Sequence, residues 1–318
     1  MEERAVFNQN VLLGHAIWAN TVATTNQESG HICRCYANQY NCRPVRPIPV
    51  LNPKEIDQCR AAAEVVVKVH QMVVERLRPG ITPTQLDRWV GETLWEHNAK
   101  SCFLGYRVQR LPPFPGQACI SRNECVVHGH PSNDELPFAQ GDLIKVDVGA
   151  LKDGFIGDAA WTYHLGPPDP TDRALMDAGI ASLRTGIAAI KPGGELLDWA
   201  VAVQDLVEGQ LGLHLVRGFG GHGLGRQLHE APFIANVRPS YPGEWTECRV
   251  RWKPGMLVAL EPMIATGTGE TSQEHRAWPI NIADGSRSVH HEHDVLITET
   301  GTEILTEALE SLPDELPV

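Results

Sequence analysis

Two aspartates, Asp147 and Asp158, lie in one stretch of the sequence whose pattern predicts a β-hairpin. Apolar and polar residues alternate on both sides of a turn signal, Lys152-Asp153-Gly154, as is typical of two antiparallel strands. Such a hairpin brings the two carboxylates together on one face. Carboxylates that face a core at close range repel each other unless a cation lies between them, so the pattern indicates a metal site. The alternative is two solvent-facing strand aspartates.

Three later segments carry further carboxylate and imidazole groups. In the run GGHGLGRQLHE, His222 and His229 stand around a glycine-rich turn, and glycine lets a backbone approach a ligand closely. Glu261 lies inside an apolar run that predicts a strand, where an unpaired charge would be costly. Glu292 lies in the polar run HHEHD. Taken singly, each segment also fits a purely structural role, as a buried histidine with a hydrogen-bond partner, an ion-pair residue or a solvated strand end.

Together these segments supply four carboxylates and one imidazole, from Asp147, Asp158, His222, Glu261 and Glu292. The set is large enough for two divalent ions that share carboxylates. Ions of this kind bind a water and lower its pKa, so that hydroxide forms near neutral pH. The chemistry that these residue types favour is therefore hydrolysis.

The elements that must position these residues follow from the periodicity of the apolar residues. The pattern predicts four helices, from 52 to a stop at Pro79-Gly80, from about 83, from 170 to about 190, and around 196–203. Strands are predicted around 118–120 and 125–127 and over 214–219, 256–264, 273–282 and 289–298. The two helix junctions resemble each other, PG before LDRW and PG before LDW, which indicates a weak internal repeat. Two related helix-helix-strand halves would place a site at the seam between them.

Composition narrows the class of protein. The chain has 318 residues, 42% apolar content and a net charge of -12, which are typical of a globular protein and do not favour binding to nucleic acid through bulk electrostatics. The sequence has no run of 18 apolar residues, so we expect no membrane span. The apolar stretch 11–23 follows an acidic start and contains polar residues, which argues against a signal peptide. The 8 scattered cysteines are typical of reduced thiols, and we expect a cytoplasmic protein.

Residues 1–51 are predicted to form an N-terminal extension, and residues 52–318 the catalytic domain. The extension contains a cluster of four groups that could hold a zinc ion: His31, Cys33, Cys35 and Cys42. Its spacing matches no common zinc module, and a flexible extension with exposed thiols is the alternative. The proline-rich run 43–49 then favours an extended linker or strap.

With these motifs in place, the chain resembles the type I methionine aminopeptidases. An HGxP motif at His128, VDVGALKDGFIGD, GHGLGRQLHE, LEPM and HEHDVLIT fall in the order and spacing of that family, over roughly Asn52 to Leu305. The resemblance implies an α+β pita-bread fold, with pseudo-twofold helix-helix-strand halves around a curved antiparallel sheet. It also implies an enzyme that removes the initiator methionine from nascent proteins and peptides when the second residue is small.

The resemblance further implies a role for each matching residue. Two divalent ions, of Co, Mn, Fe or Zn, would be ligated by Asp147, Asp158, His222, Glu261 and Glu292. Glu261 would also act as general base, while His128 and His229 would contact the scissile peptide as catalytic residues that bind substrate. The pocket for the first side chain would have as its wall Tyr106, Phe114, Cys119, Leu228 and Trp278.

Partners and rival functions follow from the same resemblance. Nascent polypeptide N-termini would be the substrates of a monomeric enzyme, and the extension could contact the ribosome. A proline-specific (Xaa-Pro) peptidase of the same fold is one alternative, but such enzymes usually carry a large domain that 51 residues cannot supply. A catalytically inactive pita-bread binding protein is another, which a lost ligand would favour, and none is lost. The sequence assigns no role to His130 or to the inserted segment 107–113.

Overall fold

The structure is a computed structural model that describes residues 48–108 and 111–318. The proposed zinc cluster of His31, Cys33, Cys35 and Cys42 therefore lies outside the described residues. In the described part of the chain the helices are α2 (Pro53–Arg76), α3 (Pro83–Glu96), α4 (Pro170–Ala189) and α5 (Leu196–Gln204), a π-helical continuation η1 (Asp205–Gln210), and a 3-10 helix η2 (Glu307–Ser311). None of them is long and apolar enough to cross a membrane.

The helix starts are set by local hydrogen bonds. Asn52 caps α2 in a capping box, in which its Oδ1 accepts from the Glu55 N–H at 3.1 Å and Glu55 Oε2 accepts from the Asn52 N–H at 3.0 Å. Thr82 caps α3 through a similar pair of bonds with Gln85. These bonds satisfy backbone donors that the first helical turn leaves unpaired. The predicted starts at Asn52 and Pro83 are confirmed.

The strands divide into four hydrogen-bonded sheets. The first joins β1 (Lys100–Ser101), β2 (Cys119–Arg122), β4 (Leu143–Lys152), β5 (Phe155–Leu165) and β16 (Glu315–Leu316). The second joins β7 (Gly220–Gly223), β8 (Glu230–Ala235), β9 (Leu257–Leu260), β14 (His293–Ile297) and β15 (Thr302–Ile304). Two smaller sheets contain β6 (His214–Leu215), β10 (Met263–Ala265) and β13 (Ser288–His290), and β3 (Cys125–Val127), β11 (Thr271–Gln273) and β12 (Ile280–Ile282).

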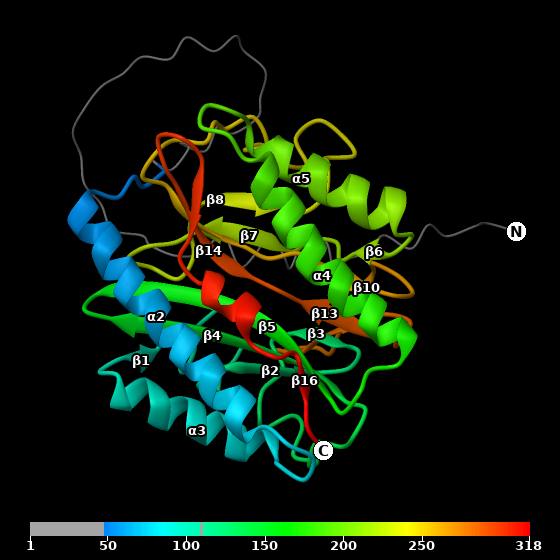
Figure 1. The fold of residues 1–318 in the computed structure, drawn as a ribbon. Coiled ribbons are helices and arrows are strands. Elements are labelled where there is room, and N and C mark those ends of the chain that lie inside the picture. The colour runs from blue at the N-terminus through cyan, green and yellow to red at the C-terminus, as the bar shows by residue number, and fades with distance from the viewer. Residues whose placement is uncertain (1–47, 109–110) are drawn as a thin grey trace, which may run out of the picture.

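The two halves predicted from the repeat are visible as two helix pairs. Helices α2 and α3 pack together, and α2 covers β4 and β5, while α4 packs with α5 and against β10 and β13. Figure 1 shows both pairs on the same side of the strands, α2 and α3 in blue and cyan, α4 and α5 in green. Nearly all strand pairs are antiparallel, as predicted, but β16 pairs with β5 in parallel. The chain thus has the helix-helix-strand halves expected of the pita-bread fold.

Four predicted strands are wrong in their extent, and two of them are interrupted near a proposed ligand. The segment 256–264 forms β9 and β10, with a break at Glu261 and Pro262, and 289–298 forms β13 and β14, with a break at His291 and Glu292. Each chain segment changes sheet at its break, and Pro262 has no N–H for a ladder hydrogen bond. Glu261 therefore lies between strands and not inside one. The predicted strand 214–219 is also shorter, because only His214–Leu215 pairs. The predicted strand 273–282 is wrong as one strand, because the chain turns back between β11 and β12, and Gln273 at the end of β11 pairs with Ile280 at the start of β12.

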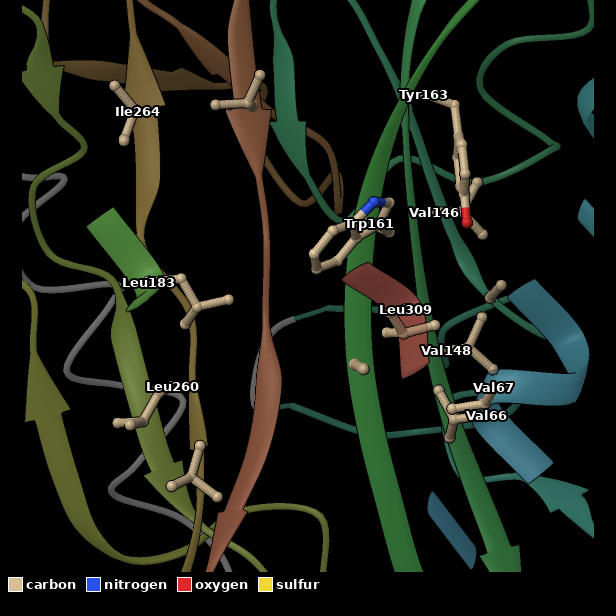
Figure 2. Close-up of a cluster of buried hydrophobic side chains, with 14 of the residues drawn as sticks. Val66, Val67, Val146, Val148, Trp161, Tyr163, Leu183, Leu260, Ile264 and Leu309 are labelled. Atoms are coloured by element: carbon tan, nitrogen blue, oxygen red, sulfur yellow. The ribbon is translucent and has the colours of Figure 1, made fainter. Parts of the chain in front are cut away.

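One apolar core runs beneath both halves. Figure 2 shows Val66 and Val67 of α2 beside Val148 of β4, with Leu309 of η2 close to them and Trp161 of β5. The same cluster of buried side chains extends to α4 and to β9 and β10. Because protein cores are packed as densely as organic crystals, strands anchored in this cluster are held in fixed positions. The proposed site lies on the opposite face of β4 and β5.

Candidate metal centre and adjoining pocket

The hairpin of β4 and β5 places Asp147 and Asp158 on one face. Asp147 is paired with Ala160, and Asp158 lies two residues before Ala160 on β5, so both carboxylates project to the same side. Asp153 and Gly154 form the two-residue turn, with φ values of 50° and 82°, as a type I′ turn requires. The predicted hairpin is confirmed, and its register brings the two acids into a diagonal pair.

The two strand breaks meet the hairpin on this face. Met263 is paired with His290 just after the first break, and Leu260 is paired with His293 just before it, so Glu261 and Glu292 lie at the same level. The backbone N–H of Glu292 donates to the carbonyl of Ala160 at 2.9 Å, which ties the second break to β5. Each glutamate lies where the chain passes between the second five-stranded sheet and the three-stranded sheet of β13, β10 and β6.

His222 completes the set from β7, between β8 and β9. A Cβ on the neighbouring Gly221 would lie 2.2 Å from the carbonyl oxygen of Ala259, so only glycine lets β7 approach β9 this closely. The glycines of the run GGHG therefore let the histidine strand fit into the sheet. His222 itself is 3% exposed, and burial lowers the pKa of its imidazole to about 4, which leaves it neutral and able to ligate a metal.

The ligand atoms converge. One atom each of Asp158, His222 and Glu292 lies within 4.8 Å of the other two. His222 Nε2 lies 3.5 Å from Glu261 Oε1 and 3.9 Å from Asp158 Oδ2. Ligands that each lie about 2.1 Å from one ion are at most about 4.2 Å apart, so the two separations from His222 fit shared coordination.

The electrostatics of the cluster also fit a cation. Burial, reinforced by neighbouring carboxylates, raises the pKa of Asp158 and of Glu292 well above its usual range, and burial raises that of Asp147 to about 7. Asp147 Oδ1, Asp158 Oδ1 and Glu292 Oε1 are buried and receive no hydrogen bond from any described residue. Buried acceptors of this kind are normally satisfied. A divalent ion would satisfy them and remove the repulsion that opposes their joint ionisation.

A cavity of about 90 Å³ opens over these carboxylates, many times the room that one water needs. Every residue predicted from the sequence for the site lines this one cavity. The predicted residues are Tyr106, Phe114, Cys119, His128, Asp147, Asp158, His222, Leu228, His229, Glu261, Trp278 and Glu292. The structure thus brings together residues spread over more than half of the chain.

Two histidines that are not in the ligand cluster lie beside it. His128 follows β3 with a left-handed backbone, φ 60°, and its ring contacts Trp278 and Phe219. The ring centroid of His229 lies 4.5 Å from that of His222. Burial lowers the pKa of His128 to about 4 and that of His229 well below its usual value, so both imidazoles are neutral near pH 7.

Apolar side chains form one wall of the cavity. Phe114, Cys119, Leu228 and Trp278 are each at most 6% exposed and belong to an apolar cluster separate from the main core. The rings of Phe114 and Trp278 meet edge to face at 5.3 Å. The indole N–H of Trp278 donates to the carbonyl of Pro112 at 2.9 Å, which fixes the ring and leaves its apolar surface to the cavity.

Sequence reasoning missed several residues that line the cavity, among them His290, Phe219 and Met263. His290 stands two positions before Glu292, and the period of two in a strand would have placed both on one face. His130, which received no role, packs edge to face against Phe114 at 5.7 Å. His130 therefore packs against Phe114 of the pocket wall.

Comparison with known proteins adds an independent line of evidence. The profile of metallopeptidase family M24 matches residues 56–299. The methionine aminopeptidase of Aquifex aeolicus is 34% identical over 265 residues, which cover 82% of this chain and 99% of that protein. The crystal structure of methionine aminopeptidase from Thermotoga maritima superposes with a TM-score of 0.74 at 35% identity, covering 82% of this chain and 99% of that one. Prolidase from Pyrococcus furiosus shares the fold at 21% identity, with a TM-score of 0.60. The superposition covers 81% of this chain and 65% of that chain.

Proposed function

The chain belongs to metallopeptidase family M24 and, within it, to the methionine aminopeptidases, and we propose that the buried carboxylate and imidazole cluster is its catalytic centre. Membership in a metallopeptidase family implies that the protein binds divalent metal. The observation that carries the proposal is the convergence of Asp158, His222 and Glu292 within 4.8 Å in a cavity that has one apolar wall. Asp147 and Glu261 complete a set that is large enough for two ions.

The ions would supply Lewis-acid activation of water in this cavity. Glu261 lines the cavity from a strand break and would take the proton of the attacking water. His229 lines the cavity beside His222, where its imidazole N–H would donate to the oxygen that becomes negative during attack. His128 is placed to assist at the peptide nitrogen as it leaves.

The proposed substrate is a peptide that begins with methionine. A wall of two aromatic rings, a thiol and a leucine offers dispersion and sulfur-aromatic contacts and few polar partners. A flexible thioether therefore fits better than a branched side chain, and a charged side chain would lose its hydration without compensation. We expect a small second residue, as in the family.

The test compares initial rates on peptides that begin Met-Ala, Leu-Ala, Lys-Ala and Met-Glu, with an Xaa-Pro peptide and N-acetyl-Met-Ala as further arms. Metal-free enzyme reconstituted with Mn, Fe, Co or Zn in turn identifies the metal that supports turnover, since a carboxylate-rich site accepts several. Met-Ala should be cut fastest and N-acetyl-Met-Ala not at all. Equal rates on Met-Ala and Leu-Ala would remove the methionine assignment, and preference for Xaa-Pro would favour the proline peptidases.

The Trp278→Ala variant tests the pocket within the same assay. Loss of the ring should raise KM for Met-Ala. It should also narrow the ratio of the Met-Ala rate to the Leu-Ala rate, because an apolar pocket distinguishes side chains by shape alone, by about 1–3 kcal/mol per methylene-sized difference, and the variant loses part of that shape. Metal content should stay unchanged, since the ring is no ligand. An unchanged ratio would place the first side chain elsewhere.

We further propose that the enzyme works as a monomer on nascent chains in the cytoplasm, with residues 1–51 as the region for any ribosome contact. The described cysteines Cys59, Cys102, Cys119, Cys125 and Cys248 are all free thiols, which supports a reducing compartment. Light scattering and co-sedimentation of the full chain and of a truncated chain with ribosomes test these two points.

A further inference from the structure

His290 lies in the cavity, yet neither the sequence motifs nor the proposed mechanism uses it. It is the last residue of β13 and is 2% exposed. Its Nε2 is buried and receives no hydrogen bond from any described residue. Because a buried polar nitrogen without a partner is costly, this atom needs an explanation.

The position of this nitrogen supplies one. His290 Nε2 lies 3.6 Å from Glu261 Oε2 and 3.8 Å from Glu292 Oε2. On the other side, His222 Nε2 lies 3.5 Å from Glu261 Oε1. The carboxylate of Glu261 therefore presents one oxygen to each of two imidazoles.

These separations are those of ligands that share an ion. With metal–nitrogen and metal–oxygen bonds of about 2.1 Å, two ligands of one ion are at most about 4.2 Å apart. Both distances from His290 fall within that limit, as do the distances from His222 to Glu261 and Asp158. They are too long for good hydrogen bonds, which lie near 2.7–3.2 Å.

The backbone of His290 is fixed in this orientation. Thr162 Oγ1 donates to the His290 carbonyl at 2.8 Å and accepts from its N–H at 3.1 Å. Across the other edge, His290 pairs with Met263. Because hydrogen bonds already hold the His290 backbone in place, metal binding would need little rearrangement of this residue.

The next histidine shows that this placement is specific to one face. His291 is fully buried on the opposite side, where its ring packs against Trp161 at 4.8 Å. A Cβ on Gly179 of α4 would lie 2.3 Å from its Nδ1. His291 is therefore packed between a strand and a helix, and alternation along the chain sorts the two neighbours, His290 toward the carboxylates and His291 away from them.

We propose that His290 is an additional metal-ligating side chain, so that the centre takes imidazoles from both sides of Glu261. The inference rests on the proposed metal centre and deepens it. A second nitrogen donor would shift the preference of the site from hard Mn²⁺ toward Fe²⁺, Co²⁺ and Zn²⁺, which imidazole suits.

The test counts ligated imidazoles in the Co²⁺-loaded protein. A histidine bound to Co²⁺ through Nε2 keeps its Nδ1–H, which gives one strongly shifted, solvent-exchangeable proton resonance. The wild type should show two such signals. His290→Gln should remove one, His222→Gln the other, and the matched control His291→Gln neither.

A second readout is metal affinity by calorimetry. His290→Gln should weaken Co²⁺ binding by about 10-fold or more, since even supporting residues of metal sites are worth 10–100-fold. The loss should be smaller for Mn²⁺, which prefers oxygen donors. Equal losses for both metals would overturn the predicted shift in preference.

The outcomes separate this inference from the proposed function. One shifted signal in the wild type that disappears in His222→Gln overturns the role of His290 and leaves the metal centre standing. Bound Co²⁺ without any shifted histidine signal overturns both. The wild-type count alone decides the question if His290→Gln does not fold.

Discussion

The hydroxyl of Tyr106 lies 2.7 Å from Nδ1 of His229. Burial raises the pKa of the Tyr106 phenol to about 12, so the hydroxyl keeps its proton near neutral pH, and we assign it as the donor in this bond. Nδ1 of His229 then accepts, which leaves the ring proton on Nε2. The tyrosine thereby selects the tautomer whose N–H can serve the reaction.

We expect Tyr106→Phe to lower kcat by about 5-fold, because one hydrogen bond contributes about 1 kcal/mol and here stabilises the tautomer that serves the reaction. Metal content should not change. The measurement is steady-state kinetics on Met-Ala with metal analysis of the same preparation. Loss of metal in this variant would mean that Tyr106 supports the ligands instead.

Ligands and acid-base residues should separate under mutation. His222→Ala and Asp158→Ala should each lose bound metal, because each removes a donor from the cluster. His128→Ala and His229→Ala should keep their metal and lose about two to four orders of magnitude in turnover. Elemental analysis of the purified proteins decides the matter, and metal loss in His229→Ala would contradict the assignment.

Gly157 should tolerate no side chain. It precedes Asp158 on β5, and a Cβ there would lie 2.4 Å from the backbone nitrogen of Ala63 on α2. Gly157→Ala would force the helix off the strand, and we expect a loss of about 2–4 kcal/mol in the free energy of unfolding. Gly301→Ala is the matched control, since a Cβ at Gly301 has nothing within 4 Å. Equal denaturation midpoints for the two variants would show that α2 can shift at no cost.

His70 should make the fold sensitive to acid. Its ring is fully buried, with Nδ1 2.9 Å from Tyr163 Oη, and burial lowers its pKa to about 4. Below its unfolded pKa of about 6.5 the unfolded chain binds a proton that the folded chain does not, so stability falls as pH drops from about 6.5 to 4. Above pH 7 both states are neutral at this position and the residue adds no pH dependence.

The variant His70→Gln removes this titration. Between pH 7 and pH 4 its unfolding free energy should fall by about 3 kcal/mol less than that of the wild type. Urea denaturation of metal-free protein at several pH values measures the difference. Parallel curves for the two proteins would show that another group carries the acid sensitivity.

Two truncations should differ in their effect on stability, because only the longer one removes residues 48–51. Deleting residues 1–42 should leave a folded, active peptidase. Deleting residues 1–51 also removes Ile48, which packs on the main core, and the bond from the Leu51 N–H to the Gly255 carbonyl at 2.8 Å. We expect the longer deletion to cost about 1–3 kcal/mol of stability. Thermal unfolding of both proteins tests this, and an insoluble shorter deletion would mean that the extension packs on the core.

Local signals made much of this fold predictable. The helix starts at Asn52 and Pro83 follow from caps that involve residues three apart, and the hairpin follows from Asp153-Gly154 between alternating strands. Signals of this kind need no knowledge of distant residues. The candidate ligands could be proposed because carboxylates in apolar runs are costly and therefore informative.

What could not be predicted depends on contacts between distant segments. The pattern around Glu261 predicts one continuous strand. The chain instead changes sheet there, because β9 before it pairs with β14 and β10 after it pairs with β13. The same change of partner interrupts the strand before Glu292. Alternation in the run HHEHD separates His290 from His291, but only contacts between distant segments show that one face meets the carboxylates and the other meets Trp161.

Asp147 and Asp158 come from the first helix-helix-strand half, and His222, Glu261 and Glu292 from the second. Any ion bound by this set would connect the halves. Its binding free energy would therefore also stabilise the two halves in their closed arrangement. A ligand that binds only the folded state stabilises that state by about 2.7 kcal/mol at 100 times its Kd. Metal starvation would remove that contribution and restore the repulsion among the carboxylates. Scarcity of metal would therefore shorten the lifetime of the protein itself, through local opening at the junction of the halves and the proteolysis that opening permits.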